Sequence, residues 1–361
     1  MYSVIKSLKK VLIIGLLAVM LVLSLSACAN DNDNDNDNDS VHNGVSDEQV
    51  VKTTTTVKLL ESGLSAVRFD GDYYFDEFIL NGGASSDSEV VGFLSGKIGT
   101  RFSFSGNPFG CSTLAVPSDN GYIFGRNFDW YACDALIVES HSDGEYASIS
   151  TVNTNFISGI NFSSLPDSAK AMIALYAPID GMNEKGLAVS VNMISDGRNI
   201  NQSTSKPDLT TTTAVRLLLN RAANVDEAVE LLQSYDLHAS MGYMIHFALA
   251  DNAGNSVTVE YINNEISVVE TKVVTNFYLS DNAPSAPDYT QAHTRYNTLI
   301  ERINSKTTFT ANDVRDALNS VSRHNYGGGE TTEWSAVYEL GTGRATYYHR
   351  EKYNKGYTFE L

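Results

Sequence analysis

The sequence predicts a layered α+β domain. Hairpin patterns occur at 111–127 and at 334–350, and four stretches with apolar residues at helical spacing lie between them. Hydrophobic residues make up 42% of the 361 residues and charged residues 19%, which is enough apolar material for a core and too little charge for a disordered chain. Strand pairs near both ends with helices between them are typical of layers of sheet and helix.

The beginning of the chain is typical of an export signal and is set aside from the fold. A basic start precedes an apolar run at 11–25, which has the length of a signal peptide and is short for a membrane span. The sequence Leu-Ser-Ala-Cys at 25–28 resembles a bacterial lipobox, in which the chain is cut before a cysteine that then carries a lipid. We therefore expect a lipoprotein signal peptide at 1–27 and a lipid anchor on Cys28, which would hold the protein at the extracytoplasmic face of a bacterial membrane. The alternative is an ordinary secretory signal with an incidental Cys28.

A polar stretch follows the signal. Asp and Asn alternate at 31–39, and the chain stays polar through residue 56. Such composition has little to bury, so we expect a disordered tether at 28–56 and order from about Val57 onward. The segment 57–110 then shows one helical stretch, around 88–94.

The first hairpin has the strongest local signal. Two β-prone runs at 111–116 and 122–127 are joined by Pro-Ser-Asp-Asn-Gly, a strong turn sequence. The alternating residues at 187–193 indicate a further strand. Later elements follow the same rules: helices at 211–222, 226–235 (with Asn224 as a cap), 292–304 and 311–321, and hairpins at 244–261 and 334–350.

Charge and cysteine usage exclude several classes of protein. The 25 Lys and Arg against 43 Asp and Glu give a net charge of −18, and clustered basic residues are absent from the sequence, so nucleic acid is not an expected partner. The negative charge mildly disfavours anionic substrates, although local charge can reverse this. Three cysteines are too few for a disulfide scaffold, and the seven histidines lack metal-ligand spacing, so neither a metal nor a cofactor is expected.

Cys111 is the candidate nucleophile. If the hairpin turns around Asp119, residue 111 lies opposite about residue 127, which places Arg126 and Asp129 beside the thiol. A neighbouring arginine favours the thiolate, the nucleophilic form of cysteine. The local sequence places no histidine there as a base. Cleavage between Gly110 and Cys111 would supply one, because a free α-amino group has a pKa of about 7.7 to 8.0. The alternative is a buried structural thiol, or a disulfide with Cys133.

The motif around Cys111 resembles that of the choloylglycine hydrolase family, which includes bile salt hydrolases and penicillin V acylases. Gly-Cys-Ser-Thr at 110–113 and Phe-Gly-Arg-Asn-Phe-Asp-Trp at 124–130 carry the resemblance. Further matches are Gly-Met-Asn-Glu-Lys-Gly-Leu at 181–187, Val-Thr-Asn at 274–276, His-Thr-Arg-Tyr-Asn at 293–297 and Glu-Trp-Ser-Ala-Val-Tyr at 333–338. The resemblance implies the four-layer αββα sandwich of N-terminal nucleophile hydrolases over about 250 residues.

The family pattern also implies roles for individual residues. Cys111 would attack an amide carbonyl, and its own α-amino group would relay the proton. Asp129 would hold that amino group, and Arg126 would stabilise the thiolate. Asn276 would donate to the oxyanion, and Arg295 matches an arginine near the nucleophile. Asn192 is a further oxyanion candidate, although its spacing is one residue short of the family pattern, and one residue on a strand changes the face.

One departure from bile salt hydrolases concerns the position of the nucleophile. There the cysteine follows the initiator methionine, whereas 110 residues precede Cys111 here. Relatives such as acid ceramidase are made as precursors and cut before the cysteine, and Gly110 fits that arrangement because glycine tolerates strained backbone. We therefore expect a zymogen with a pro-segment at 57–110, removed or retained after cleavage, and a catalytic domain at 111–361. Retention is favoured, since 73–80 holds aromatic and aliphatic residues that can pack on a partner.

The expected function is hydrolysis of a linear amide by an exported enzyme, with a small N-acyl amide as the substrate and the membrane reached through Cys28. Bile salts, penicillin V and acyl-homoserine lactones all remain open as substrates, and a homo-oligomer is compatible with the sequence. The alternatives are acyl transfer to an amine on the same fold, and a non-catalytic lipoprotein that binds a ligand.

Overall fold

The computed structural model describes residues 47–288, 291–324 and 329–361. The expected signal peptide, Cys28 and most of the expected tether lie outside this part of the chain. Among the described residues, no helix combines the length and hydrophobicity needed to cross a membrane.

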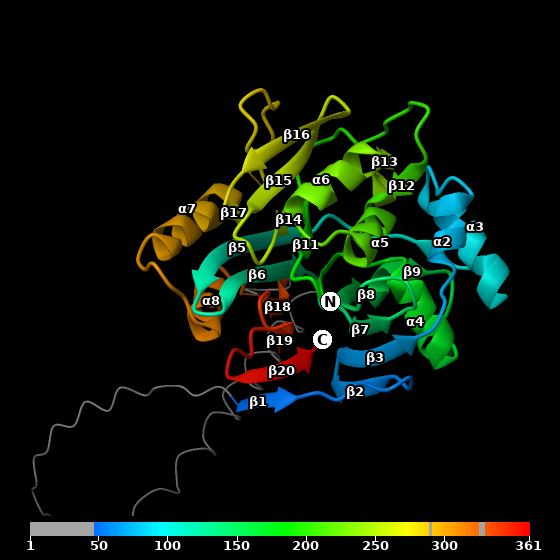
Figure 1. Cartoon of the computed structure of the whole chain (residues 1–361), viewed down its shortest axis with the longest axis horizontal. Coiled ribbons are helices and arrows are strands. Elements are labelled where there is room, and N and C mark those ends of the chain that lie inside the picture. The colour runs from blue at the N-terminus through cyan, green and yellow to red at the C-terminus, as the bar shows by residue number, and fades with distance from the viewer. Residues whose placement is uncertain (1–46, 289–290, 325–328) are drawn as a thin grey trace, which may run out of the picture. The chain divides into compact units, whose positions relative to one another are not determined.

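The described domain has four layers, with two large β-sheets face to face and helices on both outer sides (Figure 1). Helices α7 (Ala292–Ile303) and α8 (Ala311–Ser320) cover the seven-stranded sheet. Helices α4 (Asp167–Leu175), α5 (Thr211–Arg221) and α6 (Val225–Gln233) cover the nine-stranded sheet. The layered α+β prediction and the αββα order are therefore confirmed.

The seven-stranded sheet carries the first and last predicted hairpins, and its strands run in the order β1-β20-β19-β18-β6-β5-β17. Its strands are β1 (Asp47–Val50), β20 (Lys355–Glu360), β19 (Arg344–His349), β18 (Thr331–Glu339), β6 (Gly121–Trp130), β5 (Gly110–Ser118) and β17 (Val273–Val274). The pairs β5–β6 and β18–β19 confirm both hairpin predictions.

The nine-stranded sheet runs in the order β16-β15-β14-β11-β10-β8-β7-β3-β2. Its strands are β16 (Glu265–Glu270), β15 (Ser256–Ile262), β14 (Ile245–Ala250), β11 (Ala188–Met193), β10 (Asp180–Asn183), β8 (Ser148–Asn153), β7 (Ala135–His141), β3 (Leu64–Asp70) and β2 (Lys58–Glu61). The middle hairpin β14–β15 and the strand β11 match their predictions. Two small pairs complete the strands: β12 (Asp208–Thr210) with β13 (Asp236–His238), and β4 (Ser103–Phe104) with β9 (Ile157–Ser158).

The predicted helices are present with shifts of a few residues at their ends. The side chain of Asn224 accepts from the backbone N–H of Glu227, as expected of the cap of α6. The stretch at 88–94 is part of a longer helix, α3 (Asp87–Ile98), which Ser86 caps. The remaining helices are α2 (Phe75–Leu80) and three short 3-10 turns, η1 (Thr154–Phe156), η2 (Phe162–Ser164) and η3 (Ser240–Gly242).

The predicted end of the tether at residue 56 is wrong, because ordered structure begins at least by Asp47. Strand β1 pairs in parallel with β20 and thereby lies at the edge of the seven-stranded sheet. Its four side chains are exposed, so backbone hydrogen bonds hold it, among them Val51 N–H to the Thr358 carbonyl at 2.7 Å. Backbone pairing needs no apolar pattern, and a polar sequence therefore gave no sign of it.

The segment before Cys111 is also more extensively folded than its single predicted helix suggests. Strand β3 lies inside the nine-stranded sheet, between β2 and β7, and runs parallel to β7 over seven residue pairs. After it, Tyr73, Phe75 and Phe78 are fully buried and pack their rings against Tyr176 at the end of α4. Residues 47–110 thus contribute to both sheets and to the core.

Alternation along β5 and β6 positions the candidate site. Cys111 and Ala115 on β5 belong to the core between the two sheets, whereas Leu114 and Val116 pack under α7 and α8. The same alternation on β6 turns Arg126 toward the interior between the sheets, on the side of Cys111.

Candidate active site

Cys111 lies one residue into β5, with its thiol in the interface between the sheets. The residue is fully buried, Arg126 Nη2 donates to Cys111 Sγ at 3.3 Å, and Sγ lies 3.5 Å from the Val191 carbonyl of β11. In the hairpin Cys111 pairs with Phe128, one residue beyond the expected partner. The difference arises because Ser118 and Gly121 form the last pair, so the turn centre lies between Asp119 and Asn120.

Arg126 is held on every side and has no solvent exposure. Its Nε donates to Ser190 Oγ at 2.6 Å, Nη2 donates to the Val191 carbonyl at 3.0 Å, and Nη1 forms an ion pair with Asp180 Oδ2 at 2.9 Å. Its guanidinium also lies 5.3 Å from the centre of the Phe128 ring. Burial disfavours its charge, yet Cys111 and Asp180 together raise the pKa of Arg126, which therefore stays cationic.

Asp180 was missed from the sequence, although it is the buried counter-ion of Arg126. It begins β10 in the opposite sheet and accepts from Trp334 Nε1 at 3.1 Å and from the Tyr338 hydroxyl at 2.8 Å. Its signal was present, since it is a lone charged residue directly before the motif at 181–187, in an otherwise apolar stretch.

The main chain of Cys111 is fixed by two of the predicted residues. Its N–H donates to Asn276 Oδ1 at 2.8 Å, and its carbonyl accepts from Arg295 Nη1. Arg295, on α7, also donates to Asn276 Oδ1 at 2.7 Å and to Ser112 Oγ at 2.5 Å. The structure therefore brings Arg126, Asn276 and Arg295 to the thiol, the amide nitrogen and the carbonyl of a single residue.

Asp129 lies beside Gly110 rather than beside the thiol. It pairs with Gly110 in the hairpin, and the three-residue step from Arg126 turns its side chain to the opposite face of the sheet. Its carboxylate accepts from Thr332 Oγ1 at 2.7 Å, and its second oxygen lies 3.6 Å from Arg295 Nη1. The thiol and the carboxylate thus approach residue 111 from two faces, and the amide nitrogen of Cys111 lies between these faces.

Asn192 is buried on β11, where Ser190 donates to its Oδ1 at 2.9 Å. Its Nδ2 lies 3.4 Å from both the Val274 and the Thr275 carbonyls. Asn276 Nδ2 donates to the Met193 carbonyl at 2.6 Å. Both amide donors are thus engaged with backbone in the uncut chain, so the oxyanion roles of Asn192 and Asn276 stay predictions.

Burial dominates the ionisation of the site. It raises the pKa of the Cys111 thiol to about 12, against the opposing effect of Arg126, and it raises the pKa of Asp129 against Arg295 and Thr332. Burial likewise lowers the pKa of Arg295. The thiol of the uncut chain is therefore neutral at physiological pH.

Gly110 is needed for space rather than for backbone freedom. It begins β5 and is not among the glycines with positive φ, so the strain expected there is not observed. A Cβ on Gly110 would lie 3.1 Å from Asp129 Oδ2 and 3.4 Å from Arg323 Nη1. A side chain at this position would press on both groups.

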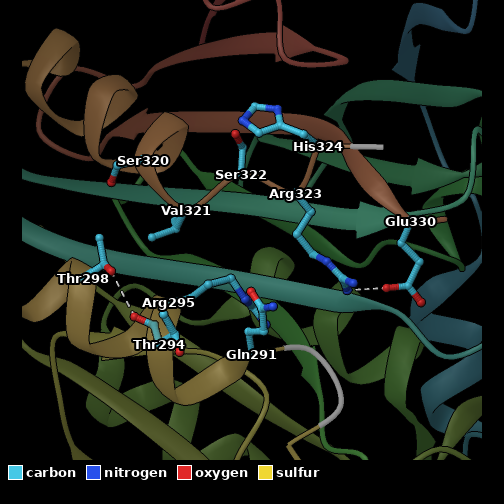
Figure 2. A pocket seen from close by; sticks show the side chains of 10 residues that line it. All are labelled: Gln291, Thr294, Arg295, Thr298, Ser320, Val321, Ser322, Arg323, His324 and Glu330. Atoms are coloured by element: carbon cyan, nitrogen blue, oxygen red, sulfur yellow. Dashed lines mark hydrogen bonds and ion pairs between the residues drawn. The ribbon is translucent and has the colours of Figure 1, made fainter. Parts of the chain in front are cut away.

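Two pockets are lined by residues that neighbour the site: Phe109 and Arg323 in one, and Arg295 and Arg323 in the other. The larger has a volume of about 640 Å³, is lined by Phe109 and Met193 among others, and has both apolar and polar walls. The smaller, of about 360 Å³, lies over Arg295 between α7 and the loop after α8 (Figure 2). Arg323 and Glu330 line both pockets.

Cys133, which the sequence indicated as a possible disulfide partner of Cys111, and His246 have other surroundings. Cys111 and Cys133 are both free thiols in the structure, so the disulfide alternative is not observed. His246 is buried, with Nε2 2.9 Å from the Thr275 carbonyl and Nδ1 3.2 Å from Glu260 Oε1, which fits a satisfied core histidine. Within the described ranges, His, Cys, Asp and Glu form no group of three or more that could hold a metal ion.

A family model described as "Acyl-coenzyme A:6-aminopenicillanic acid acyl-transferase" matches residues 116–354, about two thirds of the chain. The chain belongs to this acyl-transferase family. The matched part of this acyl-transferase family member includes Arg126, Asp129, Asn276 and Arg295. It begins after Cys111, so the interpretation of Cys111 depends on the geometry and on the motif.

Known proteins that are similar to this chain agree with the resemblance found in the sequence. Penicillin V acylase of Pectobacterium atrosepticum is 28% identical over 116 residues, which span 29% of this chain and 30% of that protein. Two crystal structures of variants of the conjugated bile acid hydrolase of Clostridium perfringens superpose with a TM-score of 0.51 at 17% identity, over 66% of this chain and 89% of theirs. The resemblance to the choloylglycine hydrolase and penicillin V acylase group and the N-terminal nucleophile hydrolase fold are thereby confirmed.

Proposed function

We propose that this protein is a self-processing amidohydrolase in which Cys111, freed as an N-terminal residue, attacks linear amides. The observation that carries the proposal is the set of contacts on residue 111: Arg126 on its thiol, Asn276 on its nitrogen and Arg295 on its carbonyl oxygen. A structural cysteine needs none of these polar contacts, whereas a nucleophile that also carries its own base needs each of its atoms positioned.

The first reaction is cleavage of the chain itself. The Cys111 thiol adds to the Gly110 carbonyl, the bond from that carbonyl to the Cys111 nitrogen breaks, and the thiol proton passes to the nitrogen, which leaves a thioester and a free amine. Water then hydrolyses the thioester to a Gly110 carboxylate and restores the thiol. Arg126 stabilises developing thiolate charge, and Asp129 holds the new ammonium from the other face.

Turnover of a substrate repeats this sequence with an external amide. Cys111 Sγ attacks the substrate carbonyl, the amino group of Cys111 transfers the proton to the leaving amine, and water releases the acid. Asn276 Nδ2 carries two N–H donors; one donates to the Met193 carbonyl, and the other would donate to the oxyanion. The pocket of about 640 Å³ beside Phe109 is large enough for an acyl chain.

Intact-mass analysis and N-terminal sequencing of the purified protein test this proposal most directly. We expect a chain that begins at Cys111 and turnover of at least one N-acyl amide in a panel with penicillin V, conjugated bile acids and acyl-homoserine lactones. A chain that stays whole, and whose ligand binding is insensitive to thiol alkylation, would instead support a ligand-binding lipoprotein.

Acyl transfer to an amine is the second candidate, favoured by the description of the family model. It shares the thioester with hydrolysis and differs only in whether water or an amine accepts the acyl group. The ratio of acid to amide product, measured at increasing amine concentration, separates the two reactions.

Export and retention of the pro-segment complete the proposal. A lipid on Cys28 would anchor residues 28–110, and the catalytic chain would stay with them because β1 and β3 belong to the two sheets. Fractionation of cells with an antibody to the C-terminus should find the catalytic chain with the membrane, and Cys28→Ser should move it to the soluble fraction. Catalytic chain wholly in the medium for the unmodified protein would contradict retention.

A further inference from the structure

Arg323 is a charged residue beside the cleavage site that the proposed mechanism does not use. It follows α8, and its Nη1 would lie 3.4 Å from a Cβ on Gly110. Since Cβ and the carbonyl carbon are both bonded to the same Cα, the guanidinium lies close to the carbonyl that the thiol attacks. Asp129 flanks Gly110 as well, at 3.1 Å by the same measure.

The backbone of Arg323 is anchored. Its N–H donates to Thr332 Oγ1 at 2.8 Å and its carbonyl accepts from Thr332 N–H at 3.0 Å, so it forms a short ladder with the start of β18. Thr332 in turn donates to Asp129. The position of the Arg323 backbone is therefore tied through Thr332 to Asp129 on β6, the residue that pairs with Gly110.

The counter-ion of Arg323 is Glu330, and the pair lies between the two pockets. Figure 2 shows Arg323 extending to Glu330, while Arg295 reaches into the same pocket from α7. Both side chains of the pair keep part of their solvent exposure, unlike the fully buried pair of Arg126 and Asp180. Burial raises the pKa of Glu330, against the opposing effect of Arg323, so this carboxylate holds its charge less firmly than an ordinary glutamate.

On the basis of the proposed self-cleavage, we propose that Arg323 forms a carboxylate-binding site whose first occupant is the Gly110 carboxylate. Cleavage converts the neutral Gly110 carbonyl into an anion, with one new oxygen from water, next to Asp129 and Glu330. A buried anion beside two acids requires a cation. Arg126 is already paired with Asp180, and Arg295 already contacts Asp129 and Asn276.

The rest of the tail is positioned for such an ion pair. Trp130 Nε1 donates to the Asn107 carbonyl at 3.2 Å, and the Tyr243 hydroxyl donates to the Gly106 carbonyl at 2.8 Å. The Phe109 ring packs 5.4 Å from that of Phe128. These contacts do not involve the bond that is cut, so the tail keeps its place and the new carboxylate stays at Arg323. An acid product released from a substrate thioester has the same chemistry and is the competing source of a carboxylate.

Carbon-13 NMR of the cut protein, labelled at the glycine carbonyl, tests the site. A C-terminal glycine carboxylate is resolved from amide carbonyls, and intact mass establishes first that the chain is cut. In the unmodified protein this signal should not titrate between pH 4.5 and 7.5. In Arg323→Gln it should titrate within that range, because the anion loses its cation, and Arg323→Lys should restore the original behaviour. Arg302→Gln, on the exposed side of α7, is the matched control and should change nothing.

The remaining outcomes are decisive as well. Identical titration in Arg323→Gln and the unmodified protein overturns the site although the chain is cut, whereas an uncut chain overturns the proposed function itself. Glu330→Gln removes a competing acid and covers the case in which Arg323→Gln does not fold. In this variant the Gly110 signal should stay free of titration down to a lower pH than in the unmodified protein. If the titration is the same in both, the result counts against the site. Added hexanoate separates the two sources: an unchanged Gly110 signal supports the tail as occupant, and a shift to the value of a free carboxylate overturns the tail in favour of the product acid.

Discussion

Cys111 and Cys133 are both buried thiols in the same core, but they have neighbours of opposite charge. Arg126 donates directly to the Cys111 sulfur, whereas a carboxylate, Glu333, accepts from the Cys133 N–H at 2.9 Å. Arg350 Nη2 donates to the Cys133 carbonyl oxygen at 2.7 Å. Burial is the largest cause of the raised pKa at both thiols; Arg126 then opposes it at Cys111, and Glu333 adds to it at Cys133.

The comparison teaches that burial raises the pKa of both thiols, and that the charged neighbours distinguish the thiol that can be activated from the one that cannot. A pKa of about 12 leaves the Cys111 thiol neutral. The proposed cleavage would add an ammonium group to the same residue, and a nearby positive charge favours the thiolate. Cys133 gains no such group.

Removal of each sulfur gives the largest expected contrast. Cys111→Ala should abolish self-cleavage and lower turnover by at least about a thousandfold, because the nucleophile is gone. Cys133→Ala should leave turnover within about threefold, since a small buried side chain is only shortened. Intact mass and an N-acyl amide assay measure both effects; equal losses in the two variants would remove the distinction between the cysteines.

Alkylation should separate the two thiols by about a hundredfold in rate. A partly processed sample treated with iodoacetamide at pH 8 contains its own control, because mass spectrometry distinguishes uncut from cut chains. We expect label on Cys111 in the cut chain, and little on Cys133 or on either cysteine of the uncut chain. Equal labelling of Cys111 before and after cleavage would contradict activation by cleavage.

Thr332→Val tests the role of Asp129 beside Cys111, because it removes the hydrogen bond that Thr332 donates to the Asp129 carboxylate. Loss of the hydrogen bond to a charged partner should lower kcat about tenfold. Burial already raises the pKa of Asp129 and Thr332 opposes this, so the variant should raise it further and move the acid limb of the pH profile upward. Thr332→Ser should restore the profile, whereas a merely structural role for Thr332 would leave the acid limb in place.

Gly110→Ala should slow self-cleavage about fivefold without affecting a chain that is already cut. The added Cβ would lie 3.1 Å from Asp129 and 3.4 Å from Arg323, and such crowding costs about 1–3 kcal/mol when neighbours cannot move. The half-life of the uncut chain after synthesis measures the effect, and Gly110→Val should lengthen it further. Cleavage of the valine variant at the rate of the unmodified chain would refute the crowding.

Glu333→Gln should have the smallest effect, because it removes the charge next to Cys133 and the ion pair with Arg350 but keeps the shape of the side chain. Loss of the carboxylate lowers the pKa of this thiol, but burial remains, so alkylation should rise by less than about threefold. Glu270→Gln, on the exposed edge strand β16, is the matched control. A rise as large as that caused by cleavage at Cys111 would show that charge rather than burial keeps Cys133 unreactive.

Whether the sequence could predict a contact depends on how far apart its two residues lie along the chain. The turn at 117–121 fixes the β5–β6 hairpin locally, and the hairpin alone places Arg126 near Cys111. It was also predictable that the side chains of Arg126 and Asp129 point to opposite faces of the sheet, since they are three residues apart on one strand. By contrast, Asn276 and Arg295 came only from the family motif, because they approach Cys111 from distant parts of the chain.

Pairings between residues far apart in the sequence could not be predicted from local spacing. Asp180 meets Arg126 across the two sheets, and Thr332 meets Asp129 across a bulged strand pair, so neither pairing follows from local spacing. The parallel pairing of β3 with β7 was missed for the same reason, since about 70 residues separate the paired positions.

The place of β3 inside the nine-stranded sheet has a consequence for the lifetime of the protein. As long as the chain is continuous, its two parts meet at the high effective concentration that a covalent connection provides, in the millimolar range for short flexible linkers. A chain cut after Gly110 that has once unfolded must find its other part by diffusion from dilute solution. The mature molecule would then be metastable: it would assemble once, from its precursor, and its survival under heat or denaturant would be a matter of unfolding rate rather than of equilibrium.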